Sequence, residues 1–186
     1  GDHRDLHLSI RRQRQMCIRD RPLDQRNQVF QNLRDGRFED VTDRAGAVFD
    51  LSEVSRGAAF GDLDNDGDTD VIIANTAGPA RLLMNAIGQQ NHWLGVELIG
   101  RLTPRDMLGA RVAFVLPDGA TLWRRARSDG SYVSANDPRV LVGLADETTP
   151  PRVRVTWPDG SVEEWRDLPI DQYTTVIQGT GNQVSP

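Results

Sequence analysis

The sequence has little of several features that commonly reveal the class of a protein. It contains one cysteine, Cys17, so no disulfide can form within the chain. Cysteine usage therefore does not indicate whether the protein works in an oxidising or a reducing compartment. No apolar run approaches the ~20 residues that a membrane-spanning helix needs. The N-terminus is polar and basic and shows no secretory signal. The formal charge of -5 argues against nucleic acid as a partner.

Catalytic signatures are also scarce. His92 is the only histidine beyond residue 7, and a lone imidazole without a nucleophile or ligand partner is weak evidence for catalysis. The serines between residues 128 and 134 form no Gly-x-Ser-x-Gly elbow. The adjacent carboxylates of Glu163 and Glu164 are typical of a strand surface. We therefore expect this chain not to be an enzyme.

One short stretch, in contrast, is unusually dense in aspartate. The five aspartates at alternate positions are Asp62, Asp64, Asp66, Asp68 and Asp70. Carboxylates this close repel one another unless a cation lies among them, and calcium accepts many oxygen ligands in a flexible cage. Gly67 gives the loop a permissive backbone. The stretch therefore predicts a Ca2+ site; the alternative is an acidic, solvated hairpin turn without metal.

The flanks of this stretch predict strands. The first part of the loop matches an EF-hand, but Ile73 stands where an EF-hand has its bidentate glutamate. A small, apolar segment, residues 57–61, comes before the loop, and a β-branched run, residues 71–75, follows it. Such a run is typical of a buried strand, so the loop joins two strands rather than two helices.

Residues 56–75, RGAAFGDLDNDGDTDVIIAN, resemble a blade of the FG-GAP/VCBS type found in integrin-α-like β-propellers. The resemblance implies an all-β fold with a partial propeller blade, and it places the family's calcium ligands on the five aspartates. A weak internal repeat relates residues 29–32, VFQN, to residues 82–85, LLMN, at an offset typical of propeller repeats. A lone blade cannot bury both faces, so we expect earlier blades upstream, and the sequence to be a fragment.

The second half predicts short strands joined by Pro-Asp-Gly turns, hence a β-sandwich or barrel-like domain. In residues 92–99, Leu94, Val96 and Leu98 share one face. Val153, Val155 and Trp157 share a face of a later strand, with Arg152, Arg154 and Thr156 on the other. We expect three tryptophans on the hairpins to lie in the core: Trp123, Trp157 and Trp165.

The stretches NHWLGVELIG, RDMLGARV, SDGSYVSANDPRVLVGL and VTWPDGSVEEW resemble the ASPIC/UnbV domain. FG-GAP repeats followed by this domain are the arrangement of the cartilage-acidic-protein-like family. The resemblance implies a secreted or cell-surface, non-enzymatic module for adhesion or for binding a glycan or an extracellular protein. The alternative is the accessory C-terminal region of a longer secreted enzyme whose catalytic part lies elsewhere.

The loop from Ser128 to Arg139 is open to two interpretations. It combines a tyrosine with asparagine, aspartate and arginine, a composition that suits a sugar- or peptide-binding surface. The same composition suits a structural loop whose polar groups satisfy one another. The sequence alone leaves both in place.

The chain divides into four parts. Residues 22–88 correspond to a terminal propeller blade, residues 89–180 to the ASPIC/UnbV-like domain, and residues 181–186 to a tail. Residues 15–21 resemble the translation of a transposase end sequence used in sequencing libraries, so we expect residues 1–21 to be an assembly artefact. The alternative is a natural basic tail; in either case we expect this segment to be disordered or loosely helical.

Overall fold

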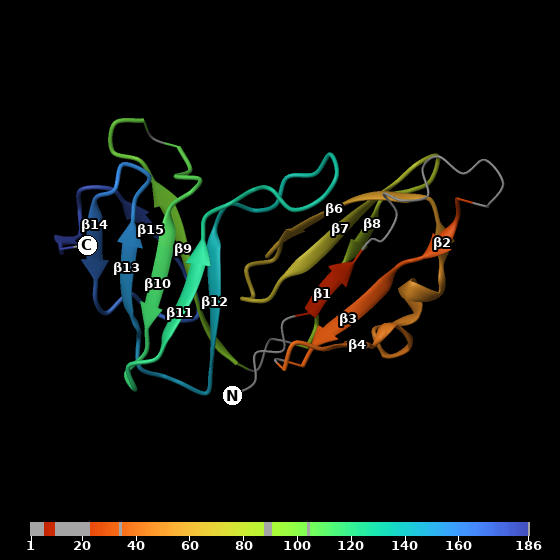
Figure 1. The fold of residues 1–186 in the computed structure, drawn as a ribbon, viewed down its shortest axis with the longest axis horizontal. Helices are drawn as coiled ribbons and strands as arrows, with labels where there is room; N and C mark the ends of the chain where they lie inside the picture. The colour runs from red at the N-terminus through yellow and green to blue at the C-terminus, as the bar shows by residue number, and fades with distance from the viewer. Residues whose placement is uncertain (1–5, 10–22, 34, 88–90, 104, 186) are drawn as a thin grey trace.

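The computed structural model describes residues 6–9, 23–33, 35–87, 91–103 and 105–185. Strands dominate these residues, and the helices among them are two short 3-10 turns, η1 (Thr42–Arg44) and η2 (Ala47–Asp50). The predicted all-β class is therefore confirmed. Figure 1 shows the strands gathered into an N-terminal and a C-terminal half that lie side by side.

The N-terminal half contains three small sheets, ordered β1-β3-β4, β2-β5 and β6-β7-β8. Its strands are β1 (Leu6–Ser9), β2 (Gln25–Arg26), β3 (Gln28–Asn32), β4 (Phe38–Asp40), β5 (Ser52–Glu53), β6 (Ser55–Gly61), β7 (Asp70–Asn75) and β8 (Arg81–Leu83). The aspartate-rich loop connects β6 to β7, which pair antiparallel. The prediction that this loop joins two strands is confirmed.

Strand β1 corrects one expectation. It lies within the segment expected to be disordered or loosely helical, yet it pairs antiparallel with β3, with Leu6 opposite Gln31. A strand edge presents unpaired N–H and C=O groups that a neighbouring segment can satisfy. Leu6–Ser9 does alternate apolar and polar residues, but only over four positions, which is too short a run to stand out in the sequence. The rest of residues 1–21, including Cys17 and the stretch that resembles a transposase end, lies outside the described residues.

The C-terminal half consists of two sheets, ordered β11-β10-β13-β14-β16 and β12-β9-β15. Its strands are β9 (His92–Ile99), β10 (Arg111–Val115), β11 (Thr121–Arg125), β12 (Val140–Ala145), β13 (Arg152–Thr156), β14 (Val162–Trp165), β15 (Tyr173–Ile177) and β16 (Asn182–Gln183). All the pairs within these sheets are antiparallel except β9 with β15, which run parallel. The predicted boundary between residues 88 and 89 falls in a segment outside the described residues.

The core of the C-terminal half lies between its two sheets, a sandwich-like arrangement. The side chains that meet there include Leu94, Val96, Leu98, Val112, Phe114, Val142, Val153 and Val155. Fully burying an aliphatic or aromatic side chain of this size stabilises a fold by roughly 1.5–3 kcal/mol. The predicted grouping of Leu94, Val96 and Leu98 on one face of β9, and of Val153 and Val155 on one face of β13 with Trp157 just beyond its end, is therefore confirmed.

Two predictions about side chains in this half are wrong. Trp157 is buried in the core and Trp165 packs against it, but Trp123 is 51% exposed. Trp123 lies on the outer face of β11, because the register of the sheet pairs it with Ala113 of β10 on the side away from the core. Glu163 and Glu164, expected on a strand surface, are both buried.

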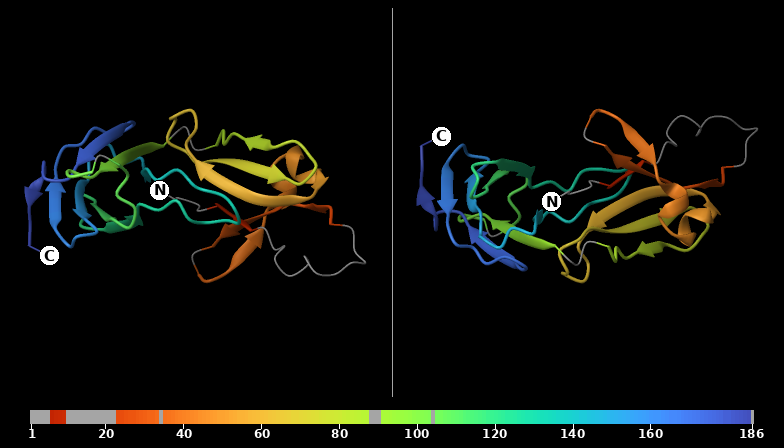
Figure 2. Two further views of the ribbon diagram at one scale, coloured as in Figure 1. Left: turned by 90° about the horizontal axis from the view of Figure 1, so that it is seen from above. Right: turned by 90° about the horizontal axis from the view of Figure 1, so that it is seen from below.

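The two halves meet along β6. The loop between residues 127 and 139 extends from the C-terminal half to this strand, as Figures 1 and 2 show in teal and yellow. Ala58 N donates to Ser131 Oγ at 3.2 Å, and Phe60 N donates to Asn136 Oδ1 at 3.0 Å. Asp137 N in turn donates to the carbonyl oxygen of Phe60 at 2.9 Å. These contacts favour the structural interpretation of the Ser128–Arg139 loop.

Candidate metal centre

The hairpin between β6 and β7 gathers the aspartates. Gly61, the last residue of β6, lies opposite Asp70, the first residue of β7. The chain between them therefore closes on itself, and Asp62 and Asp70 become neighbours at its base. Carboxylate oxygens of Asp62, Asp64 and Asp70 lie within 4.8 Å of one another. This group can hold a metal ion.

The other two predicted ligands are not members of this group. Asp66 Oδ1 accepts a hydrogen bond from Asp68 N at 3.1 Å, so its carboxylate shapes the backbone of the loop. Asp68 is buried. The structure thus brings together three of the five predicted ligands, and the role of the full set stays a prediction.

Backbone N–H groups hold the two buried carboxylates in place. Asp62 Oδ1 accepts from Asp66 N at 3.2 Å, and Asp62 Oδ2 accepts from Gly67 N at 3.0 Å. Asp70 Oδ2 accepts from Leu63 N at 2.9 Å, and Asp70 Oδ1 accepts from Asn85 N at 2.8 Å. Each carboxylate oxygen has two lone pairs, so these bonds leave acceptor capacity for a cation.

The loop turns through two left-handed backbone positions. Asn65 has φ 61° and Gly67 has φ 91°. Asparagine and glycine are the residues that adopt this conformation most readily. Gly67 also lies directly beneath the indole ring of Trp93, where a Cβ atom would overlap the ring. A glycine is therefore required here for two separate reasons.

Two side chains of the C-terminal half close over the loop, and we call Arg139 and Tyr173 the interdomain clamp. Arg139 Nη2 donates to the carbonyl oxygen of Asp62 at 2.7 Å, and Nη1 donates to Asn65 Oδ1 at 2.6 Å. Arg139 Nε donates to Asp137 Oδ2 at 2.7 Å, which orients the guanidinium group. The guanidinium carbon of Arg139 lies 3.9 Å from the centre of the Tyr173 ring, which is a cation–π contact.

Tyr173 extends the clamp to the cluster itself. Its hydroxyl group donates to Asp62 Oδ2 at 3.0 Å, and its ring packs against Trp93 with centroids 5.1 Å apart. Burial, reinforced by the negative charge of Asp62, raises the pKa of the Tyr173 hydroxyl, so it stays a donor at physiological pH. One carboxylate of the candidate centre is thus held from both halves of the molecule.

Electrostatic crowding at the loop favours a bound cation. Partial desolvation and the negative charges of Asp66, Asp70 and Asp62 raise the pKa of the Asp64 carboxyl. A cation among these groups would relieve that repulsion. The donors are carboxylate oxygens, which suit hard cations such as calcium, and Asp64 is exposed and so gives access from solvent. The residues present therefore fit the predicted Ca2+.

Sequence reasoning missed most of the residues that surround the loop. It included Arg139 only as a member of a candidate binding loop, and it gave Tyr173 and Trp93 no role near the aspartates. Arg139 lies 77 positions and Tyr173 lies 111 positions from Asp62 in the sequence. No local pattern signals contacts of that kind.

The residues considered for catalysis serve structural roles. His92 Nδ1 lies 2.8 Å from Asp171 Oδ2, and Asp171 Oδ1 accepts from the backbone N–H of Trp93 at 3.1 Å. This pair fastens the start of β9. The Ser134 hydroxyl donates to the carbonyl oxygen of Tyr132 at 3.1 Å, a bond within its own loop.

Comparison with known proteins shows what kind of chain this is. Residues 17–73 match the FG-GAP-like repeat family, and residues 100–183 match the ASPIC and UnbV family. The chain is therefore an FG-GAP-like repeat followed by an ASPIC/UnbV domain, as predicted, and it is similar to the cartilage acidic proteins. One such relative, cartilage acidic protein 1 of Xenopus tropicalis, is 40% identical over 58 residues.

That match covers 31% of this chain and 9% of the relative. The relative is thus far longer than the part that this chain resembles. None of the helices in the described part of the chain has the length and hydropathy of a membrane-spanning segment.

Proposed function

We propose that the chain is a non-enzymatic, calcium-binding extracellular module that serves adhesion by contact with a glycan or an extracellular protein. The observation that carries the proposal is the convergence of Asp62, Asp64 and Asp70 at a strand turn, closed from outside by the interdomain clamp. The likeness to a cartilage acidic protein supports the extracellular setting.

In this proposal the chain's own residues position the carboxylates of the site and connect the loop to the joint between the two halves. The backbone of the loop holds the carboxylates of Asp62 and Asp70, and the exposed carboxylate of Asp64 would complete the group that holds the ion. Calcium supplies positive charge that offsets the repulsion of these carboxylates when it is bound. Because Arg139 and Tyr173 hold Asp62, ordering of the loop also orders the joint between the halves.

The test is thermal unfolding of the whole chain in calcium, in magnesium and in chelator. At a calcium concentration 100 times the Kd, binding adds about 2.7 kcal/mol of stability. For a chain of this size, that raises Tm by about 5–10 °C. Magnesium should give a much smaller rise, since it demands a rigid octahedral site. A Tm that ignores calcium would make the loop an acidic turn and remove the proposal's support.

A further inference from the structure

The outer face of the five-stranded sheet carries a cluster that the candidate metal centre does not use. We call it the arginine face, and its members are Arg111, Trp123, Arg125, Arg152 and Arg154. The register of the sheet aligns them in rows across β10, β11 and β13: Arg111 lies opposite Arg125, and Ala113 lies opposite both Trp123 and Arg154. Directly paired residues in a sheet project from the same face about 5 Å apart.

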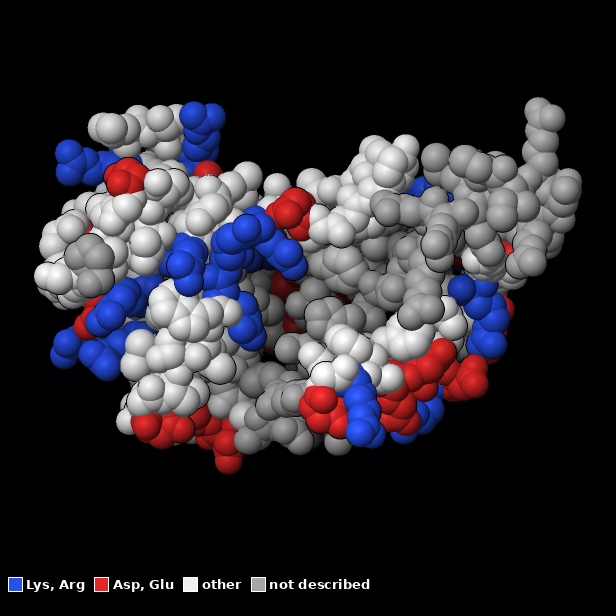
Figure 3. Space-filling view, in the orientation of Figure 1, with Lys and Arg blue, Asp and Glu red and all other residues white. Residues whose placement is uncertain are grey.

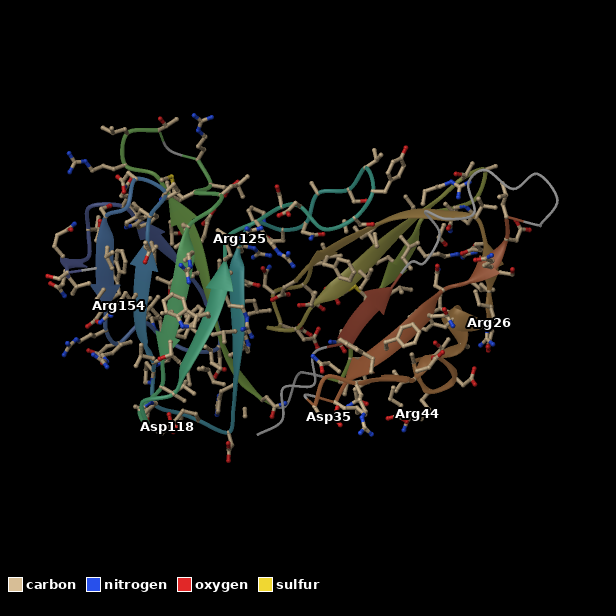
Figure 4. The ribbon with its side chains drawn as sticks, viewed as in Figure 1. Arg26, Asp35, Arg44, Asp118, Arg125 and Arg154 are labelled. Atoms are coloured by element: carbon tan, nitrogen blue, oxygen red, sulfur yellow. The ribbon has the colours of Figure 1, made fainter. Side chains whose placement is uncertain are left out.

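This face is strongly cationic on a chain that is acidic as a whole. With neighbouring Arg166, it has five guanidinium groups, and the carboxylates that pair with them in the described residues are Glu164 and Asp129. The net charge of the chain is -5. Figure 3 shows arginine side chains in blue over the half that holds this sheet, and Figure 4 shows Arg125 and Arg154 on it.

The basic residues of the whole chain are of one kind. The sequence has 22 lysine and arginine residues together, and every one is arginine. A guanidinium group is planar and presents its N–H donors as a fork that matches a carboxylate, whereas an ammonium group is a strongly hydrated point charge. The face therefore suits oxyanions that accept two parallel hydrogen bonds, carboxylates among them.

Glu164 shows which anion this face accommodates. Its side chain is 5% exposed, and its carboxylate lies 3.2 Å from Arg154 Nη2 and 3.1 Å from Arg166 Nη2. Arg152 Nη1 lies 3.9 Å away. Burial alone would raise the pKa of this carboxyl, yet the hydrogen bonds from Arg154 and Arg166 outweigh burial and lower it. The arginines thus stabilise a carboxylate and keep charge to spare.

Trp123 adds a second kind of contact. Its indole is 51% exposed, and the guanidinium carbon of Arg111 lies 5.0 Å from the centre of the ring. This stacking fixes the orientation of the ring. An exposed, oriented indole between arginines offers a flat apolar surface on which the C–H face of a sugar ring can lie.

We propose that the arginine face binds an acidic polysaccharide whose repeated uronate carboxylates pair with the arginines while a sugar ring stacks on Trp123. The arginines are spread over three adjacent strands, β11, β10 and β13, which suits a polymer with repeated charge. An acidic protein segment would satisfy the arginines but would leave Trp123 without a ring to cover. This assignment deepens the proposed function and rests on it, because it names the glycan class and its surface.

The experiment is a binding titration of the whole chain with polygalacturonate oligomers, measured by isothermal calorimetry. A chelator is present throughout, because polyuronates themselves bind calcium; binding at the arginine face is then measured apart from the metal centre. The same oligomers with their carboxyl groups reduced to alcohols serve as the neutral probe. Heparin, poly-glutamate and single-stranded DNA serve as competitors of other classes.

The variants are Trp123→Ala, Arg125→Gln and a matched control, Arg37→Gln. Trp123 and Arg125 are exposed, so their removal leaves the core intact. Arg37 is an exposed arginine in the N-terminal half. We expect each variant of the face to weaken polyuronate binding by about tenfold or more, and the control to change it less than about twofold. Binding should also weaken as salt rises.

Several results would overturn the assignment. Tighter binding of heparin would indicate that the arginine face binds a sulfated glycan. Tighter binding of poly-glutamate would indicate an acidic protein, and tighter binding of DNA a nucleic acid. Equal binding of the carboxyl-reduced oligomers, or no binding of the polyuronate, would remove the role of the arginines. A calcium-insensitive Tm together with intact polyuronate binding would refute the metal site and leave this assignment standing, so the two failures are distinguishable.

Discussion

At the scale of single residues, the carboxylates of the candidate centre divide into two kinds. Asp62 and Asp70 are buried and accept backbone N–H groups, so they fold the loop as well as face the cluster. Asp64 is exposed, and its pKa is raised by partial desolvation and by the negative charges around it. Its removal should therefore relieve repulsion without breaking the frame of the loop.

The first prediction follows from this difference. Asp64→Ala should leave Tm in chelator unchanged or slightly higher, because a like charge is removed, and it should abolish most of the rise in Tm that calcium causes. Combining it with Asp66→Ala should abolish the rise completely. Asp146→Ala, which removes an exposed carboxylate of the C-terminal half, is the control and should keep the full calcium response. A full response in Asp64→Ala would remove this residue from the site.

The second prediction concerns Gly67, with another glycine of the chain, Gly36, as the control. Gly67→Ala forces a side chain into the left-handed region and against the Trp93 ring. Gly36 has a similar φ of 85°, but a Cβ there would meet no atom within 4 Å. In urea denaturation, Gly36→Ala should cost about 1 kcal/mol, the backbone strain alone, and Gly67→Ala should cost clearly more. Equal losses would mean that Trp93 yields its position freely.

At the scale of elements, an ion pair joins two strands of the N-terminal half that belong to different sheets. Arg81 in β8 donates through Nε and Nη2 to both carboxylate oxygens of Glu53 in β5, with the shortest distance 2.6 Å. Asn75 Nδ2 in β7 donates to the same carboxylate at 3.0 Å. These hydrogen bonds, above all those from Arg81, lower the pKa of Glu53. A bidentate pair supported by a third donor is the kind of surface pair that contributes measurably.

The third prediction concerns the pH dependence of this pair. Because the pKa of Glu53 is lower in the folded chain than in the unfolded chain, its contribution is present above the unfolded value. It is lost as the pH falls below about 4.3, where an unperturbed glutamate is half protonated. Glu53→Gln should therefore destabilise the chain at pH 7 and matter little at pH 3. Urea denaturation of both proteins at the two pH values measures this, and a difference that stays constant with pH would contradict it.

The same scale shows how much the sequence could predict. The aspartate loop and its two strands follow from one continuous stretch, in which repeated carboxylates, Gly67 and the β-branched run 71–75 all act locally. Which side chains share a face in β9 and in β13 also follows from alternation within a single strand. Where residues close together in the sequence determine the local structure, the structure confirms what the sequence predicts.

Sequence-based prediction of side-chain burial failed where contacts between segments distant in the sequence determine the structure. Along β11, apolar and polar residues occur on both faces, so alternation could not assign Trp123 to the outside; its register with Ala113 does. Glu163 is buried because the N–H groups of Gly179 and Gly181 donate to it, 16 and 18 positions away. The interdomain clamp is of the same type, since it joins residues that no local pattern connects.

At the scale of the whole molecule, the clamp makes the two halves dependent on each other. Arg139 donates to the loop, pairs with Asp137 and stacks on Tyr173, which itself holds Asp62. Hydrogen bonds that involve a charged group contribute about 1.5–3 kcal/mol each. Several of them at one joint amount to a large share of the ~5–15 kcal/mol that stabilises a domain. We therefore expect the halves to unfold together.

The last prediction tests this coupling. The wild-type chain should unfold in one calorimetric transition, which calcium moves as a whole, because the ion stabilises the only folded unit. In Arg139→Ala the joint is broken, so two transitions should appear, and calcium should raise only the one that belongs to the half with the aspartate loop. Arg44→Ala, which removes an exposed arginine far from the joint, should keep one transition. A single transition in Arg139→Ala that calcium still moves would mean that the hydrogen bonds between the 127–139 loop and β6 hold the halves together without the clamp.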